Sequence, residues 1–217
     1  MPFLVKHLGL VDYVSTYEAM RTFTKERDAN TPDEIWVLQH LPVFTLGLAG
    51  DANNLHSPSQ EIPLVQVDRG GEITYHGPGQ VVVYLLLDLK RLGIFVKELV
   101  SRIEQALIDT LADYEIQAQR LKGAPGIYIA NQPGVAEEWV GAKVAALGLK
   151  VSKSCSYHGL ALNVATDLEA FGRIHPCGYE GLRTVDMQSL GIKDNIDTIS
   201  QKLLEHLQKQ LMSHDHK

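Results

Sequence analysis

The chain has 217 residues, 45% of them apolar and 21% charged, which is ordinary for a water-soluble protein with one sizeable core. No stretch approaches the ~20 apolar residues of a membrane span, and the first residues lack the features of a signal peptide. We therefore expect one domain over residues 1–217, located in the cytoplasm. The net charge of −6 argues against nucleic-acid binding. Cys155 and Cys177 are expected to be free thiols, because a cytosolic chain of this size needs no disulfide.

The first part of the chain predicts one helix and four strands. Residues 12–30 place Tyr13, Tyr17, Met20 and Phe23 at helical spacing. Strands are predicted at 34–40 and 43–46, separated by Pro42, and again at 62–68. The apolar run at 81–89 has the character of a buried central strand.

The second part predicts two amphipathic helices around further strands. Apolar residues recur every three or four positions over 94–114, and Ile199, Leu203, Leu207 and Leu211 do so in a closing helix. Strands are expected at 116–121, 126–130, 139–151 and 159–165. Many strands with unevenly placed helices, and no regular βαβ alternation, indicate an α+β fold with mixed sheets packed by helices.

A glycine-rich segment, RGGEITYHGPGQ at residues 69–80, is the first candidate for function. Glycine lets a ligand or another backbone approach closely, so the segment suits the wall of a ligand groove, although two tight turns would also explain it. It is neither a Walker phosphate loop nor a dinucleotide fingerprint. His76 is either a general base or, more simply, a ring that hydrogen-bonds the turn and shapes the pocket. Arg69 either pairs with a carboxylate or anchors the loop.

Two residues with reactive side chains stand apart. Lys143 lies among small and apolar residues, where it either reaches solvent or is desolvated and able to shuttle a proton. Cys177 lies in His-Pro-Cys-Gly-Tyr, a turn in which a thiol can meet a reacting carbonyl and free amides can face an oxyanion. Taken alone, Lys143 is more simply a surface lysine and Cys177 more simply a core thiol.

The other cysteine has no such surroundings. Cys155 lacks the turn chemistry of Cys177, so we expect a buried or partly buried structural thiol. A zinc set of Cys155, His158, His175 and Cys177 matches no familiar spacing, and we expect no metal site.

In combination, the segments resemble the octanoyltransferases of protein lipoylation. The resemblance rests on RGGEITYHGPGQ at 69–80, PGIYI at 125–129, KVAALG at 143–148, HGLALNV at 158–164 and HPCGY at 175–179. Their order and spacing span most of the chain. The resemblance implies a fold similar to the catalytic domains of biotin and lipoate protein ligases. One departure is Gln188, where many relatives have Thr before Ser189-Leu190; this affects support of the site rather than the acyl chemistry.

The resemblance also implies an activity. An octanoyl group passes from octanoyl-acyl carrier protein to a lysine of a lipoyl domain, in 2-oxoacid dehydrogenases or the glycine cleavage H protein. Cys177 becomes the acyl-thioester nucleophile and Lys143 the residue that tunes it. No cofactor and no ATP are expected. The implied substrate-binding residues are Arg69, Gly70, Gly71, Glu72, Ile73, Thr74, Tyr75, His76, Ala146, Leu147, Gly148, Gly159, Leu160 and Ala161.

Two alternative functions and one docking question remain open from the sequence alone. An ATP-dependent lipoate or biotin ligase would share the fold without needing a nucleophilic thiol. A non-catalytic acyl-binding protein would need neither Cys177 nor turnover. For the carrier protein, expected to be acidic, Lys150 and Lys153 are candidate contacts, although they fit a solvated face equally well.

Overall fold

The computed structural model describes residues 3–57, 61–175 and 182–213 of the chain. Its strands are β1 (Leu4–Val11), β2 (Glu34–His40), β3 (Val43–Leu46), β4 (Leu64–Gln66), β5 (Ile73–His76), β6 (Gln80–Leu86), β7 (Ala118–Leu121), β8 (Ala124–Ile129), β9 (Lys143–Ser152) and β10 (Cys155–Asn163). Its helices are α1 (Tyr13–Glu26), α2 (Leu89–Leu92), α3 (Val96–Ala112), α4 (Leu168–Phe171) and α5 (Ile196–Met212), with 3₁₀ turns at Ala52–Asn54 and Glu137–Trp139.

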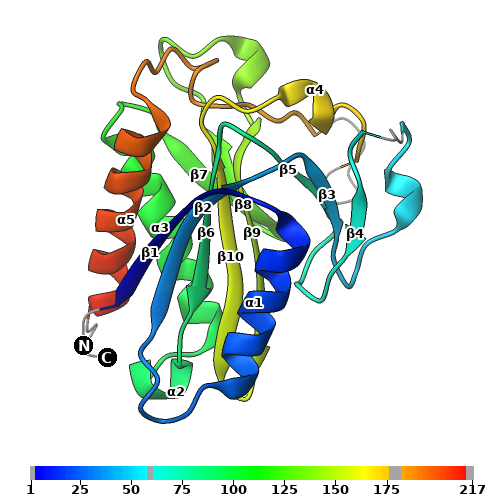
Figure 1. Ribbon diagram of the computed structural model, residues 1–217. Helices are drawn as coiled ribbons and strands as arrows, with labels where there is room; N and C mark the ends of the chain where they lie inside the picture. Colours follow the sequence, from blue (N-terminus) through cyan, green and yellow to red (C-terminus); the bar gives the residue numbers. More distant parts are fainter. Residues whose placement is uncertain (1–2, 58–60, 176–181, 214–217) are drawn as a thin grey trace.

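The strands form two sheets. A seven-stranded sheet has the order β1-β2-β6-β10-β9-β8-β7, and a three-stranded sheet has the order β4-β3-β5. Among the strand pairs of the described residues, β1 with β2 and β3 with β4 run parallel and the others antiparallel. Helices α3 and α5 cover one face of the large sheet, while α1 and the small sheet lie on the other (Figure 1). The prediction of an α+β fold with mixed sheets and helices is confirmed.

Local chemistry explains where the long helices begin and which side they bury. The Asp12 carboxylate accepts a hydrogen bond from the Ser15 amide, and the Asn195 side chain accepts one from the Thr198 amide, so α1 and α5 both start at a capped amide. Helix α3 starts after Phe95 without a side-chain cap. In α3 and α5 the predicted apolar stripes are buried against the large sheet and one another.

The sequence prediction differs from the structure at several element boundaries. Strand β1 was not predicted, because it is a largely exposed edge strand with polar Lys6 and His7 in its middle. The strand predicted at 81–89 ends at Leu86, since Asp88 caps helix α2. The strand predicted at 62–68 is only Leu64–Gln66. Residue Trp139 lies in a 3₁₀ turn rather than in β9, and β10 begins at Cys155, earlier than predicted.

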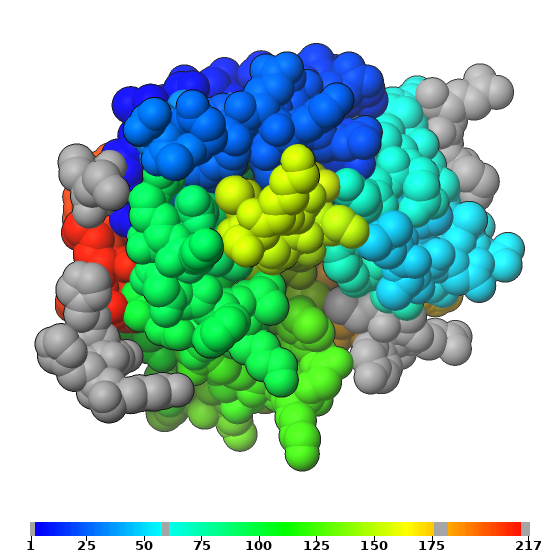
Figure 2. Space-filling view, turned by 90° about the horizontal axis from the view of Figure 1, so that it is seen from below, coloured from blue at the N-terminus to red at the C-terminus, as the bar shows by residue number. Residues whose placement is uncertain are grey.

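The hairpin of β9 and β10 forms two adjacent inner strands of the large sheet. The turn at its tip meets α2, where the Leu89 amide donates to the Ser154 carbonyl. Figure 2 shows this yellow turn between the blue N-terminal segment and the green α2–α3 region. Lys143, at the start of β9, lies at the other end of the hairpin. No helix among the described residues is long and apolar enough to cross a membrane.

Candidate functional site

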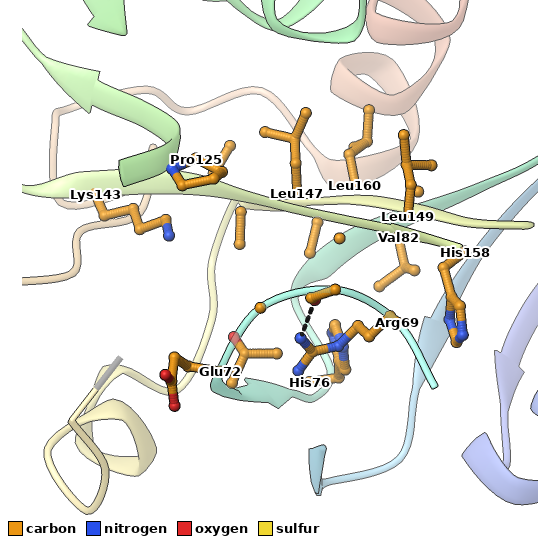
Figure 3. A pocket seen from close by; sticks show the side chains of 18 of the residues that line it. Arg69, Glu72, His76, Val82, Pro125, Lys143, Leu147, Leu149, His158 and Leu160 are labelled. Carbon is orange, nitrogen blue, oxygen red and sulfur yellow. Dashed lines mark hydrogen bonds between the residues drawn. The ribbon is translucent and has the colours of Figure 1, made fainter. Parts of the chain in front are cut away.

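A pocket of about 480 Å³ lies between the glycine-rich segment and the strands β9 and β10 (Figure 3). The residues from the glycine-rich segment approach from the side of the small sheet. The wall opposite them is made by the middle of β9 and β10. Much of this wall is apolar and small, with Ala146, Gly148, Gly159 and Ala161 among the lining residues.

Arg69 fixes the glycine-rich segment in place. Its buried guanidinium donates to the carbonyl and to the hydroxyl of Thr45 in β3, and to the carbonyl of Gly70. The Gly70 amide in turn donates to the Leu149 carbonyl of β9 at 3.1 Å. The loop is thereby tied to both sheets, and the interpretation of Arg69 as an anchor is the one these contacts support.

The backbone alternation of β9 and β10 sorts their side chains between core and pocket. Leu147, Leu149 and Leu160 point to the side of α3, whereas Val82 and His158 point to the side of the glycine-rich segment (Figure 3). Successive residues of a strand face opposite sides of the sheet. The alternation of large and small residues in KVAALG and GLAL therefore sends large side chains toward α3 and leaves small ones facing the glycine-rich segment.

A β-bulge directs Lys143 toward the pocket. The pairing of β8 with β9 shifts register between Ile127–Ala145 and Tyr128–Lys143, so Val144 is an extra residue. Both Val144 and Ala145 are consequently buried in the core on the α3 side, and Lys143 lies on the pocket side. Its side chain is only 6% exposed, and its ammonium nitrogen lies 5.7 Å from the centre of the Tyr128 ring. Lys143 is therefore a buried pocket residue, not the surface lysine that its sequence alone favoured.

A chain of buried polar groups forms another part of the wall. His76 Nδ1 lies 2.7 Å from Gln80 Oε1, and Gln80 Nε2 donates to Asn163 Oδ1 at 2.9 Å and to the Tyr75 carbonyl. Burial lowers the pKa of His76 to about 3, with nearby His40 adding to the shift. The ring is uncharged at neutral pH and engaged with Gln80, which supports the pocket-shaping interpretation of His76 over the general base.

Aromatic rings from α1, β2 and β6 surround this polar part of the pocket wall. The Tyr13 ring stacks on His76 at 5.8 Å, and His40 Nε2 lies 2.7 Å from the Tyr84 hydroxyl. Burial lowers the pKa of His40 to about 4 and raises the pKa values of Tyr13 and Tyr84 above their usual range. All four groups are neutral near pH 7, so this part of the wall carries no charge toward an apolar ligand.

His158 adopts an unusual backbone conformation inside β10. Its φ is 59°, in the left-handed region. Its ring stacks on that of Tyr157, and both side chains reach the Asp68 carboxylate. Although burial opposes ionisation of Asp68, hydrogen bonds from His158, Tyr157 and Tyr17 hold its pKa below the usual range. The side chains of the consecutive residues Tyr157 and His158 therefore lie on the same side of the sheet. His158 also lines the pocket.

The structure brings nearly all the predicted site residues together. Lining the pocket are Arg69, Gly70, Gly71, Glu72, Ile73, Thr74, His76, Lys143, Ala146, Leu147, Gly148, Gly159, Leu160 and Ala161. The Tyr75 ring is buried instead against Phe44 and Phe171, between the small sheet and α4. Cys177 lies outside the described residues.

Several lining residues were not among those predicted. The lining also includes Tyr13, Gln80, Val82, Tyr84, Pro125, Leu149, His158 and Asn163. The motifs quoted for the family resemblance already contain Gln80, Pro125, His158 and Asn163. These residues could have been predicted as substrate-binding residues on that ground. Tyr13 and Tyr84 carry no local signal, since one looks like part of a helix face and the other like part of an apolar strand.

Cys155 occupies a different environment at the far end of β10. It is a buried free thiol whose pKa is raised by burial. The predicted burial of this thiol is confirmed, and its structural role stays a prediction. Within residues 3–57, 61–175 and 182–213, no group of three or more His, Cys, Asp or Glu side chains is placed to hold a metal ion.

Solved structures of lipoate and biotin protein ligases have the same fold as this chain. A bipartite lipoate protein ligase from Thermoplasma acidophilum aligns with a TM-score of 0.68 at 13% identity, over 97% of this chain and 84% of that chain. A lipoate-protein ligase A bound with ATP gives 0.69 at 13%, covering 97% and 86%. A biotin protein ligase from Aquifex aeolicus gives 0.53 at 16%, covering 97% and 69%. At these identities the likeness establishes the fold.

Curated relatives are much more similar in sequence. An octanoyltransferase of Polynucleobacter asymbioticus is 84% identical over 212 residues, covering 98% of this chain and 99% of that protein. An octanoyltransferase of Paraburkholderia phytofirmans is 56% identical, covering 95% and 85%. The family model of the lipoyl protein ligase A/B catalytic domain matches residues 12–208. The chain therefore belongs to the lipoyl protein ligase A/B catalytic domain family.

Proposed function

We propose that this chain is an octanoyltransferase, an acyltransferase that moves an octanoyl group from a carrier-protein thioester to a lysine amine of a lipoyl domain. One observation carries the proposal: Lys143 is buried at one end of a pocket walled by small and apolar residues. The relatives at 84% and 56% identity are named octanoyltransferases, which supports the same activity here.

The pocket suits an uncharged acyl chain. Gly148, Ala146 and Ala161 leave space along β9 and β10, while the neutral His76 and Tyr13 rings form the neighbouring wall. An octanoyl chain in this space removes apolar surface from water. The same enclosure keeps water from hydrolysing a reactive thioester.

Two transfer steps share one nucleophile and one proton carrier. The Cys177 sulfur attacks the octanoyl thioester carbonyl while Lys143 accepts the thiol proton, and amides near Cys177 and Gly178 are our candidates for holding the oxyanion. The carbon–sulfur bond to the carrier breaks, and the departing thiolate takes the proton from Lys143. The acceptor lysine amine then attacks the acyl-cysteine, the carbon–sulfur bond to Cys177 breaks, and Lys143 carries the amine proton to the departing Cys177 thiolate, which restores both groups. An amide replaces a thioester, so no ATP is consumed.

The anchored residues on either side of the Cys177 segment support its pairing with Lys143. On one side the His175 amide donates to the carbonyl of Asn54, whose side chain donates to the pocket residue Glu72. On the other side the carbonyl of Arg183 accepts a hydrogen bond from the Lys143 amide at 2.8 Å. Residues 176–181 connect two points that both adjoin the pocket, and Cys177 is the cysteine between them.

The expected partners follow from this chemistry. The donor is octanoyl-acyl carrier protein, and the acceptors are lipoyl domains of 2-oxoacid dehydrogenases and the glycine cleavage H protein. The reaction requires no cofactor, and the cytoplasm is its expected location. A single domain over residues 1–217 remains our interpretation of the chain.

Incubating the purified chain with octanoyl-acyl carrier protein and an apo lipoyl domain, without ATP, tests the proposal. Mass spectrometry should find octanoyl-lysine on the acceptor and, before acceptor is added, octanoyl on Cys177. Cys177→Ser and Lys143→Ala should each reduce transfer by about 100-fold or more, whereas Cys155→Ser and Lys209→Ala serve as controls that keep it. Wild-type transfer by Cys177→Ser would refute the mechanism, and a strict need for ATP would assign the chain to the ligases.

A further inference from the structure

Gly126 in β8 lies directly against the Lys143 side chain. Its φ is +135°, and a Cβ built there would overlap Lys143 Cε. The same Cβ would lie 3.1 Å from Lys143 Nζ and 2.7 Å from the Ala145 carbonyl oxygen. Lys143 is therefore placed where any other residue at position 126 would have its first side-chain atom.

The backbone of Lys143 leaves its side chain little choice of direction. The β-bulge at Val144 directs the side chain to the pocket side, and the Lys143 amide and carbonyl are hydrogen-bonded to Arg183 and Val185. Because the backbone is held on both sides, the side chain cannot respond to a new neighbour by moving its Cα. The Lys143 side chain would instead have to rotate, which moves its ammonium group away from position 126.

Pro125 and Gly126 begin the PGIYI motif, and the active-site chemistry so far has given this glycine no part. Resting on the proposed role of Lys143, we propose that Gly126 is a positioning residue for the transfer reaction: the absence of a side chain at position 126 keeps the Lys143 ammonium at the reacting end of the pocket. Gly126 touches no substrate and acts only through Lys143.

A glycine with positive φ also has a purely structural value, and the two effects must be separated. Gly141 offers the matched control, because it lies two residues before Lys143 with a φ of +77°. No atom of the described residues lies within 4 Å of a Cβ built on Gly141. Gly141→Ala therefore adds a side chain at a positive φ near Lys143 without a contact to Lys143 or to the Ala145 carbonyl. Because the φ values of the two glycines differ, +77° against +135°, it is the non-additivity with Lys143→Ala, and not the size of the loss, that separates the two effects.

The experiment is a double-mutant cycle on octanoyl transfer to Cys177, with thermal unfolding measured on the same samples. The variants are Gly126→Ala, Lys143→Ala, their double variant, Gly141→Ala, and Gly141→Ala with Lys143→Ala. Residues that act through one another give non-additive effects, whereas independent residues add. We expect Gly126→Ala to lose about 100-fold or more, the scale of a proton-transfer group, and to add little to the loss already caused by Lys143→Ala.

The unfolding temperature gives a second readout, in which Lys143→Ala should compensate for part of the effect of Gly126→Ala instead of adding to it. Removing the Lys143 side chain relieves the overlap with Lys143 Cε but leaves the 2.7 Å contact with the Ala145 carbonyl oxygen, so the double variant should recover part of the unfolding temperature that Gly126→Ala alone loses. This keeps the test decisive even if Gly126→Ala folds poorly. Gly141→Ala should retain transfer, and its effects should add to those of Lys143→Ala.

Additive losses for Gly126→Ala and Lys143→Ala, with no recovery of unfolding temperature in the double variant, would overturn the inference. Near-normal transfer by Gly126→Ala would overturn it as well. These outcomes are distinct from failure of the proposed function, in which Lys143→Ala itself keeps wild-type transfer.

Discussion

The two faces of the β9–β10 hairpin differ although the same residues build both. Toward α3 and α5 the hairpin presents Leu160 and Leu162, which are part of the main core, and Leu147, which is partly buried against it. Toward the glycine-rich segment it presents Ala146, Gly148 and Ala161, which line the pocket. Large side chains on one face stabilise the fold, and small ones on the other leave the space in which an acyl chain is to bind.

The contrast shows that an open pocket depends on a filled core behind it. Small side chains on the pocket face of a strand bury little apolar surface and so contribute little to stability. The side chains on the opposite face have to contribute most of the packing energy. The predictions that follow change one face at a time, from the largest expected effect to the smallest.

Leu162→Ala should act on the core face alone. Leu162 is fully buried against β6 and the helices, so its truncation leaves a cavity and lowers the free energy of unfolding by about 2–5 kcal/mol. Urea unfolding monitored by circular dichroism measures the loss. Transfer per folded molecule at low temperature should stay near wild type, and a selective loss of transfer would show that the faces are not separable.

Ala146→Leu should act on the pocket face alone. Ala146 is partly exposed within the pocket, so a larger side chain there displaces ligand atoms rather than core atoms. A few methylenes of lost space are worth about 10- to 100-fold in discrimination. Competition between octanoyl and butanoyl donors should shift toward butanoyl, with little change in unfolding temperature. An unchanged preference would place the acyl chain elsewhere.

The neutral imidazoles of the pocket wall predict acid sensitivity. The pKa values of His76 and His40, about 3 and about 4, lie below the unfolded value of 6.5. The unfolded chain therefore binds more protons in this range, and the stability contributed above pH 6.5 is lost as the pH falls toward 4.

His76→Gln should flatten that dependence while keeping an amide beside Gln80. Unfolding temperatures measured from pH 7.5 to 4.5 should fall less steeply for the variant than for the wild type. Equal slopes for the two proteins would mean that His76 does not remain neutral in the fold.

Cys155→Ala should have the smallest effect. The thiol is buried at the start of β10, away from Lys143, so its removal costs about 1 kcal/mol or less of unfolding free energy. Octanoyl transfer should be unchanged in a steady-state assay. An octanoyl adduct on Cys155 in the wild-type protein would contradict the assignment of a purely structural thiol.

Sequence patterns located most elements because their physics is local. The stripes of α3 and α5 and the apolar run of β6 appear where they were predicted, since burial of one face imposes its period on the sequence. Strand β1 escaped prediction because an exposed edge has no such constraint. Most pocket residues were found through motif resemblance, whereas Tyr13 and Tyr84 were missed because they reach the pocket from elements that look like ordinary core.

The sequence by itself determined the α+β class, the alternation of large and small residues on β9 and β10, and the motifs that indicate acyl transfer. Only the tertiary structure decided that Lys143 is buried in the pocket and that His76 stays neutral. The physical reason is that both depend on non-local neighbours: the bulge against β8 and the bare Gly126 place Lys143, and Tyr13, Gln80 and His40 surround His76.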